Sequence, residues 1–282
     1  MLGNYSQSLF SNEKDSIESD TIFNNAVAFS VDPNGNIFVL DNGNSELVKL
    51  RIEGTRVIGI YSYKWTKLAF DQPHDIISPN GLDIYVADYG NHRILRFDRN
   101  INLLSMIPAD NNGRTGDRQF GYPISVAISR IGKLYILDRD NIRLIKLSSD
   151  NIFENTISGV QAGKGRLLNP IKVRISNRDR IFIQDGNSIK LYDIFGNYLT
   201  TIGEDIFKHL TSFTVTDSIV WVIDSCNLYH LDFDGRINSS LILQELIKDP
   251  SPVIDISAQN GILYFLTRNK LFYKNLNELE IN

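Results

Sequence analysis

Histidines often hold metal ions or move protons in proteins, and this chain has four of them: His74, His92, His209 and His230. A three-histidine metal site needs three of them to converge on one ion. Only His74 and His209 stand at or just before segments that we expect to lie beside the centre of the fold. The histidines therefore do not predict such a site, and we expect no cofactor.

Three long segments point instead to recognition of a partner. Residues 62–72, 108–122 and 158–169 carry aromatic and basic side chains between predicted strands. Exposed aromatic residues and arginines dominate recognition sites. We expect a binding face made by Tyr63, Lys64, Trp65, Lys67, His74, Arg114, Arg118, Tyr122, Lys164 and Arg166. The alternative, that Trp65 and Phe70 fold back onto the core as plugs, stays open.

Acidic residues gather in other segments, which predicts a binding face that is basic and aromatic on one side and acidic on the other. These acids are Glu13, Asp15, Glu18, Asp20, Glu204, Asp205, Glu245 and Asp249. The sequence has no serine nucleophile elbow, no phosphate-binding loop and no HExxH motif. The short motifs therefore favour binding over catalysis.

The composition fits one large folded domain or two small ones. The chain has 282 residues, of which 42% are hydrophobic and 22% charged, so it is neither disordered nor a membrane protein. A net charge of −4 disfavours a nucleic-acid surface along the whole chain. The single cysteine, Cys226, excludes an internal disulfide and a zinc site of several thiolates.

The N-terminal segment has neither the basic region nor the apolar region of a signal peptide. No apolar run approaches the roughly 20 residues that a membrane helix needs. We expect a soluble protein without membrane insertion. Its compartment stays open, because a cytoplasmic protein and an exported one with its signal removed would look alike.

A short phrase recurs along the whole chain and determines which elements position these residues. It consists of an aliphatic residue, an aromatic, an aliphatic, any residue and then Asp. The copies occupy residues 37–41, 84–88, 134–138, 181–185, 220–224 and 263–267, with Thr267 replacing the last Asp. Their last positions are spaced by 47, 50, 47, 39 and 43 residues. Such regular spacing indicates a repeat architecture.

Each copy belongs to a unit of about four short strands separated by turn residues. In the second unit we expect strands at 73–77, 84–87, 93–97 and 103–107. The third and fourth units repeat this order at 124–128, 134–137, 143–147 and 152–157, and at 171–175, 181–184, 189–192 and 198–202. The sequence between these strands has no long run of apolar residues at the 3.6-residue spacing of an α-helix, so we expect no helices there.

The second strand of each unit is apolar on both faces, so it must be covered on both sides. Six four-stranded antiparallel sheets around an axis meet this need, because each sheet buries its faces against the next. We predict an all-β, six-bladed β-propeller that forms a single domain over residues 1–282. Residues 1–23 are a leader, in which 5–10 would supply the outer strand of the last blade and close the ring.

The units resemble NHL repeats, the repeats of a six-bladed propeller family. The second unit carries the best match, DIYVADYGNHRI at residues 83–94, which looks like the family phrase D-x-G-N-x-R-I after the second strand. The first unit matches less well, because Glu46 stands where the arginine would be. The resemblance covers nearly the whole chain and implies the fold, whereas propellers host many unrelated activities.

The resemblance also suggests enzymes to compare with. The related amidating lyases hold a metal with several histidines, which this sequence fits poorly. Lactonases of the same shape hold calcium with oxygen atoms at the starts of inner strands. The comparable residues here are Asn24, Asn25, His74, Asp75, Ser125, Lys172, Ser212 and Asp255. His74, Asp75 and Asp255 are the alternative metal site, although Lys172 adds a competing positive charge.

The residues of the repeat itself are expected to be structural. Asp41, Asp88, Asp138, Asp185 and Asp224 would accept hydrogen bonds from backbone N–H groups in the turns that they open. The aromatic residues three positions earlier would pack between blades. These are Phe38, Tyr85, Tyr135, Phe182, Trp221 and Tyr264.

We therefore predict a non-enzymatic binding or scaffold propeller that contacts a protein partner through its inter-blade loops, alone as a monomer or within a larger assembly. A metal-dependent hydrolase or lyase with its site at the central channel is the first alternative. An RNA-binding NHL propeller is the second, which the sequence pI of about 5.6 disfavours.

Overall fold

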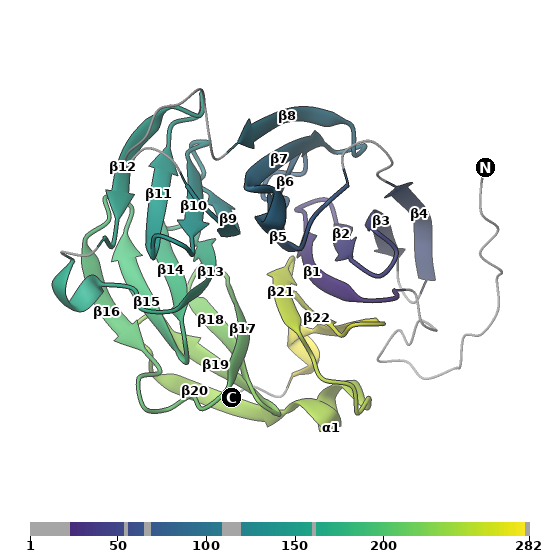
Figure 1. The fold of residues 1–282 in the computed structure, drawn as a ribbon. Coiled ribbons are helices and arrows are strands. Elements are labelled where there is room, and N and C mark those ends of the chain that lie inside the picture. Colours follow the sequence, from purple (N-terminus) through teal and green to yellow (C-terminus); the bar gives the residue numbers. More distant parts are fainter. Residues whose placement is uncertain (1–22, 54–55, 65–68, 109–119, 160–161, 280–282) are drawn as a thin grey trace.

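The computed structural model describes residues 23–53, 56–64, 69–108, 120–159 and 162–279 (Figure 1). In this part of the chain, six antiparallel sheets surround a common axis. The fold is the six-bladed β-propeller that the repeat predicts, and five of its sheets have four strands. No helix of the described residues is long and apolar enough to span a membrane.

The strands of each blade run in order from the axis outward. Blade one has β1 (Ala26–Val31), β2 (Asn36–Asp41), β3 (Glu46–Glu53) and β4 (Arg56–Lys64). Blade two has β5 (Pro73–Ile77), β6 (Asp83–Asp88), β7 (Arg93–Asp98) and β8 (Leu103–Pro108). Blade three has β9 (Pro123–Ile128), β10 (Leu134–Asp138), β11 (Arg143–Leu147) and β12 (Phe153–Ile157).

The remaining blades follow the same order. Blade four has β13 (Pro170–Ile175), β14 (Arg180–Asp185), β15 (Ser188–Asp193) and β16 (Tyr198–Ile202). Blade five has β17 (Leu210–Val215), β18 (Ile219–Asp224), β19 (Asn227–Asp232) and β20 (Ile237–Ile242), followed by α1 (Leu243–Ile247). Blade six has β21 (Asp255–Gln259), β22 (Ile262–Leu266) and β23 (Leu271–Asn275). Three short 3₁₀ helices are η1 (Tyr89–Asn91), η2 (Gly163–Gly165) and η3 (Leu276–Glu278).

The second strands are buried on both faces because each one packs against two neighbouring blades. In β2, Phe38 and Leu40 join a cluster with blade two, and Ile37 and Val39 join a cluster with blade six. All four side chains are fully buried. The six aromatic residues of the repeat phrase, Phe38, Tyr85, Tyr135, Phe182, Trp221 and Tyr264, are also buried. The apolar phrase therefore explains why the sheets stack around a ring.

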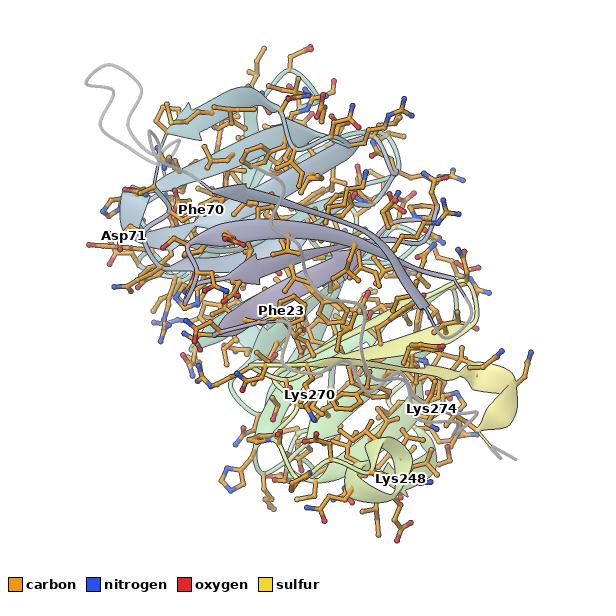
Figure 2. The ribbon with its side chains drawn as sticks, turned by 90° about the vertical axis from the view of Figure 1, so that its right-hand side faces the viewer. Phe23, Phe70, Asp71, Lys248, Lys270 and Lys274 are labelled. Atoms are coloured by element: carbon orange, nitrogen blue, oxygen red, sulfur yellow. The ribbon has the colours of Figure 1, made fainter. Side chains whose placement is uncertain are left out.

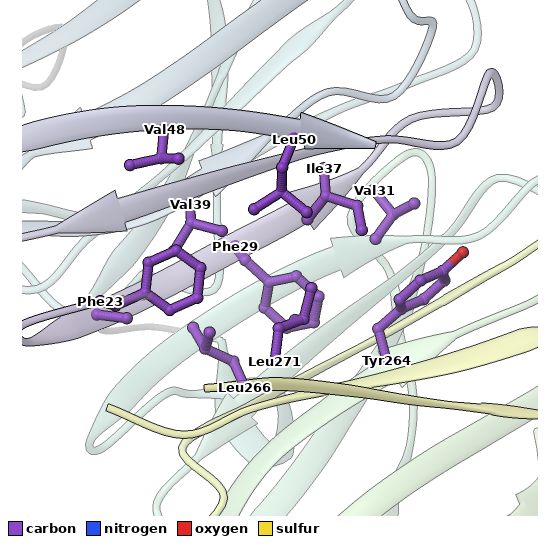
Figure 3. Close-up of a cluster of buried hydrophobic side chains, with 11 residues drawn as sticks. Phe23, Phe29, Val31, Ile37, Val39, Val48, Leu50, Tyr264, Leu266 and Leu271 are labelled. Atoms are coloured by element: carbon purple, nitrogen blue, oxygen red, sulfur yellow. The ribbon is translucent and has the colours of Figure 1, made fainter. Parts of the chain in front are cut away.

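The ring closes where blade one meets blade six. Phe29 and Val39 pack there against Leu266 and Leu271 (Figure 3). The Ala26 N–H also donates a hydrogen bond of 2.8 Å to the Arg268 carbonyl across the same seam. Within the described residues, the sixth sheet has three strands. The closure strand predicted at residues 5–10 lies outside them.

Antiparallel order gives the propeller two unlike faces. The loops that join one blade to the next reach the start of each inner strand on the same side as the turns between second and third strands. We call this side the loop face. The turns between first and second strands and between third and fourth strands lie on the opposite side, the turn face. Of the predicted binding residues, His74, Tyr122, Lys164 and Arg166 belong to the loop face.

Candidate functional site

The inner strands of blades one to five each carry a β-bulge near their start. The pairing of first and second strands shifts there, which leaves Val27, His74, Ile124, Ile171 and Thr211 without a partner in the register. A bulge turns a side chain out of the regular alternation and is common next to functional sites. All five side chains line one cavity at the loop-face end of the channel.

This cavity has a volume of about 140 Å³ and two rings of side chains. The outer ring, which we call the collar, consists of the five bulge residues and Ile254, so it is mostly aliphatic. The next residue of each inner strand forms the second ring, which we call the floor. The floor consists of Ala28, Asp75, Ser125, Lys172, Ser212 and Asp255, and all of these except Ser125 line the cavity.

One ion pair of the floor joins blades two and four. The two terminal nitrogens of Arg174 donate hydrogen bonds of 2.8 Å each to the two carboxylate oxygens of Asp75. Ser125 donates its hydroxyl proton to the same carboxylate. Burial opposes ionisation of Asp75, but the charge and hydrogen bonds of Arg174 outweigh it and hold the pKa of Asp75 below its usual range. Asp75 is therefore an ionised, fully bonded group.

A second ion pair joins blades four and six. The Lys172 ammonium contacts the Asp255 carboxylate and donates a hydrogen bond of 2.8 Å to Ser212 Oγ. Ser212 in turn donates to Asp255 Oδ1 at 2.7 Å. Burial lowers the pKa of Lys172, the charge of Arg174 lowers it further, and the two carboxylates partly offset both effects. The four charges of the two pairs cancel.

The alternative metal site is brought together in space but does not have the form of a metal site. His74, Asp75 and Asp255 line the same cavity. Each carboxylate, however, faces a cation of the protein. No group of three or more His, Cys, Asp or Glu side chains that could hold a metal ion exists among the described residues.

Gln184 is a buried residue of this cavity that the sequence argument missed. Its side chain is fully buried and donates a hydrogen bond of 2.9 Å from Nε2 to the Leu210 carbonyl of the next blade. Its Oε1 atom has no hydrogen-bond partner among the described residues. Buried polar atoms are nearly always hydrogen-bonded, so this acceptor in the wall of the cavity is available to a molecule inside it.

Four aromatic rings form a chain on the loop face beside the cavity. The ring centroids of His74 and Tyr89 are 4.7 Å apart, those of Tyr89 and Tyr122 are 4.9 Å apart, and those of Tyr122 and His92 are 4.2 Å apart. His92 Nδ1 lies 3.0 Å from the Gly121 carbonyl oxygen. We call these four side chains the ring cluster. It extends from the mouth of the channel across blades two and three.

The ring cluster is accessible and uncharged at its inner end. The His74 side chain is exposed, and those of Tyr89, His92 and Tyr122 are half-buried. Partial desolvation at the edge of the cavity, and then the charge of Arg139, lower the pKa of His74, against a smaller opposing effect of Asp75. His74 is therefore neutral at pH 7, and the exposed Arg139 supplies a positive charge beside it.

The structure places the predicted binding residues unevenly. His74 and Tyr122 meet through Tyr89 in the ring cluster. Lys164 and Arg166 are exposed at η2, at the start of blade four. Tyr63 and Lys64 end β4. The other four, Trp65, Lys67, Arg114 and Arg118, lie outside the described residues. Phe70 packs against the core between blades one and two, as the plug alternative expects.

Tyr89 and His92 are the functional candidates that sequence reasoning missed. They occupy the variable positions of the turn in the second repeat, next to the glycine and asparagine that resemble the family phrase. Variable positions of a repeat turn face solvent, so aromatic residues there are a readable signal. His92 holds this turn with a positive φ of 52°.

The predicted acidic side of the face is mixed with lysines in the part that the structure describes. Asp249 is paired with Lys270 at 3.1 Å, and Lys248 and Lys208 stand near Glu245 and Asp205 in the sequence. Figure 2 shows Lys248 and Lys270 in the green and yellow part of the molecule, which is blades five and six. The predicted acids of residues 13–20 lie outside the described residues.

The repeat aspartates attach the loops of the loop face to the sheets. Asp88 accepts a hydrogen bond of 2.9 Å from the Asp71 N–H, and Asp138 accepts one of 3.0 Å from the Gly121 N–H, in each case 17 residues earlier. Asp88 also accepts 2.6 Å and 2.9 Å bonds from Arg93 and Asn91. The sequence argument expected bonds from backbone N–H groups of the turn that each aspartate opens, and Asp41 accepts one of 3.1 Å from Gly43. The backbone N–H groups that donate to the other four aspartates lie in the incoming loop, an attachment that the sequence argument did not predict. This attachment holds the ring cluster in place.

A larger hollow of about 540 Å³ opens on the turn face, at the other end of the channel. Hydroxyl and amide side chains from the ends of the inner strands line it, including Thr214, Ser257 and Gln259. Two asparagine side chains at its rim are hydrogen-bonded within the protein. Asn177 donates to Asp217 at 2.6 Å, and Asn260 donates to the Pro33 carbonyl at 3.0 Å.

Comparison with known proteins agrees with this architecture. Residues 70–97, which comprise the entry to blade two and most of its first three strands, match the model of the NHL repeat. The structure of a streptogramin B lyase is similar with a TM-score of 0.62 and 13% identity, over 94% of this chain and 86% of that chain. The selenomethionine-substituted virginiamycin B lyase from Staphylococcus aureus is similar with a TM-score of 0.62 and 12% identity, over 92% of this chain and 96% of that chain.

A catalytically inactive variant of the Staphylococcus aureus virginiamycin B lyase with quinupristin gives a TM-score of 0.59 and 10% identity, over 97% of this chain and 89% of that chain. At such identities the likeness establishes the fold alone. The chain is a six-bladed β-propeller in which residues 70–97 match the NHL repeat.

Proposed function

We propose that this propeller is a binding module that holds a protein partner on its loop face, over blades two to four. The observation that carries the proposal is the ring cluster, in which His74, Tyr89, His92 and Tyr122 form a continuous aromatic surface beside Arg139. Aromatic and arginine side chains are the commonest anchors of protein interfaces. Lys164 and Arg166 extend the surface toward blade four.

The way in which the backbone holds the ring cluster supports a role in binding a protein partner. Because His74 sits on a β-bulge and the turn of Tyr89 and His92 is bonded to Asp88, these side chains are already ordered in the free protein. Anchors that are held in place lose little conformational entropy when a partner binds. The short distances between the rings also give one surface rather than scattered contacts.

The experiment compares partner capture by three forms of the tagged protein in its own source cells. The first is the wild type, and the second is the double variant Tyr89→Ser with Tyr122→Ser. The third is the control Phe195→Ser, which removes an aromatic side chain that is 75% exposed on the turn face. We expect at least one protein to be captured equally by the wild type and the control, and about tenfold less by the double variant.

Equal capture by all three forms would contradict the proposal, as would loss of capture in Phe195→Ser alone. Circular dichroism of the double variant checks that its propeller remains folded. A binding loss without a change in fold then assigns the effect to the surface.

A metal-dependent hydrolase or lyase is the second candidate, because His74, Asp75 and Asp255 line one cavity. The pairing of both carboxylates with cations argues against it, since a metal ion would have to displace Arg174 and Lys172. Elemental analysis of the purified protein separates the two candidates. One equivalent of metal that is lost in Asp255→Asn would favour the enzyme.

RNA binding finds less support. The described cations of the loop face stand among acids, and the net charge of the chain is −4. A protein that contacts several phosphates binds with a steep dependence on salt. Salt-sensitive retardation of RNA in a gel would revive this function.

A further inference from the structure

The cavity at the loop-face end of the channel is lined by polar groups whose hydrogen-bonding capacity is not fully used within the described residues. Its volume of about 140 Å³ is well above the roughly 10–15 Å³ that one water molecule needs. Gln184 Oε1, a fully buried acceptor, has no partner among the described residues. We propose that this cavity binds a small uncharged molecule with a primary amide and a short alkyl chain. The proposal does not depend on the protein-binding function.

Lys172 and Gln184 lie opposite each other in the register of β13 and β14, so both side chains leave the sheet on the same side. An ammonium group has three N–H donors. Lys172 directs one at Asp255 and one at Ser212, and within the described residues the third has no acceptor. Lys172 and Gln184 Oε1 therefore offer a spare donor and a spare acceptor on the same side of this sheet.

A primary amide matches these two groups. Its carbonyl oxygen accepts from Lys172, and its NH₂ group donates to Gln184 Oε1. A carboxylate has no proton for Gln184, and an ammonium ion has no lone pair for Lys172. The donors and acceptors of these three groups therefore favour the amide over a carboxylate or an ammonium ion of the same size.

The charge of the floor leads to the same ligand. The Asp75–Arg174 and Lys172–Asp255 pairs cancel each other's charge, and the lowered pKa of His74 keeps that ring neutral at pH 7. An ionic ligand would bring one uncompensated charge into a buried site, which is costly. An uncharged ligand avoids this cost.

The collar specifies the apolar part of the ligand. Val27, Ile124, Ile171 and Ile254 surround the polar floor with aliphatic side chains. Ala28 is the smallest member of the floor and has no polar side-chain atom, so it leaves room on the blade-one side. Most ligand pockets combine an apolar wall with a few placed polar groups. An alkyl chain of a few carbons fits such a collar.

The test uses butyramide as the probe, with butyrate and butylammonium as charged analogues of similar size. Binding is followed by amide chemical shifts of the ¹⁵N-labelled protein. We expect saturable binding of butyramide in the millimolar range, which is usual for so small a ligand, with shifts confined to residues of the collar and floor. We expect each ion to bind about tenfold more weakly.

Two variants assign the site. Ala28→Leu fills the cavity and should abolish binding, whereas Gln184→Met removes the acceptor and should weaken binding about fivefold. Thr214→Val, in the turn-face hollow, is the matched control and should leave binding unchanged. Well-dispersed spectra show that each variant is folded. If only one of Ala28→Leu and Gln184→Met folds, that variant alone assigns the site.

Three results would overturn the proposal. They are the absence of saturable butyramide binding to the folded wild type, equal binding of butyrate, and unchanged binding in both folded cavity variants. A cavity that holds only water would give the first result.

Discussion

The two ends of the propeller channel differ in how their polar groups are satisfied. The turn-face hollow is larger, about 540 Å³ against 140 Å³, yet Asn177 and Asn260 at its rim are hydrogen-bonded to other groups of the protein. The smaller cavity on the loop face contains the unpartnered Gln184 Oε1 and stands beside the ring cluster. The loop-face end is therefore distinguished by its unpartnered hydrogen-bond acceptor and its aromatic surface, and not by the volume of its cavity.

The aspartates of the two faces show the same contrast. On the turn face, Asp98 and Asp193 accept bonds from N–H groups two and four residues later, so each closes only its own turn. On the loop face, Asp138 and Asp185 accept bonds from residues 16 or 17 positions earlier. One kind of aspartate closes a turn, and the other fixes a loop that carries candidate binding residues.

The largest expected effect tests the ion pairs that separate the two ends. Asp75→Leu leaves the guanidinium of Arg174, whose side chain is 16% exposed, without its carboxylate partner, so we expect a loss of about 3–5 kcal/mol in the free energy of unfolding, measured with urea. The double variant Asp75→Leu with Arg174→Met should lose clearly less than the single one. A loss below about 1 kcal/mol in Asp75→Leu would show that the pair is not a buried, coupled unit.

Acid should weaken the same pair. The pKa of Asp75 is lower in the folded protein than in the unfolded chain, so its contribution is complete above the unfolded pKa of about 3.9 and is lost as the pH falls through the folded pKa. We expect the unfolding free energy of the wild type to fall more steeply below about pH 4 than that of Asp75→Asn. Parallel pH profiles would contradict this assignment.

The next effect sharpens the contrast between the aspartates. Asp138→Ala removes the acceptor of the Gly121 N–H and of Arg143 Nε, and we expect a loss of about 1–3 kcal/mol in the free energy of unfolding. Asp193→Ala, on the turn face, should lose about 1 kcal/mol or less. Chemical denaturation measures both. Equal losses would mean that the two kinds of aspartate are equivalent.

The smallest effect concerns the turn-face rim. Asn177→Ala removes an exposed hydrogen bond to Asp217, so we expect a change within about 0.5 kcal/mol and no effect on butyramide binding. A thermal melt and one titration check this. A loss of butyramide binding would move the ligand to the turn-face hollow.

The sequence predicts the sheets well because the repeat phrase is apolar on both faces. Ile37 and Phe38 point to opposite neighbours, and only a blade between two others buries both. The floor residues Asp75, Lys172 and Asp255 were also found, because they stand near the starts of recognised strands. The positions of an inner strand therefore follow from the repeat alone.

What the sequence does not predict depends on contacts between distant blades. Lys172 and Asp255 are 83 residues apart, so nothing local shows that they neutralise each other. The bulge at His74 depends on its register with β6, which one strand alone does not reveal. The orientation of the Gln184 amide likewise depends on another blade, because Nε2 donates to the Leu210 carbonyl of blade five while Oε1 has no partner among the described residues. These features of the site belong to the assembled ring.

The central claim, that recognition takes place on the loop face, is tested most directly by blocking each face in turn. In a Cys226→Ser background, a bulky maleimide is attached either to His92→Cys on the loop face or to Phe195→Cys on the turn face. The account predicts that the loop-face label abolishes capture of the partner and that the turn-face label leaves it unchanged. Capture that survives the loop-face label and is lost with the turn-face label would contradict it.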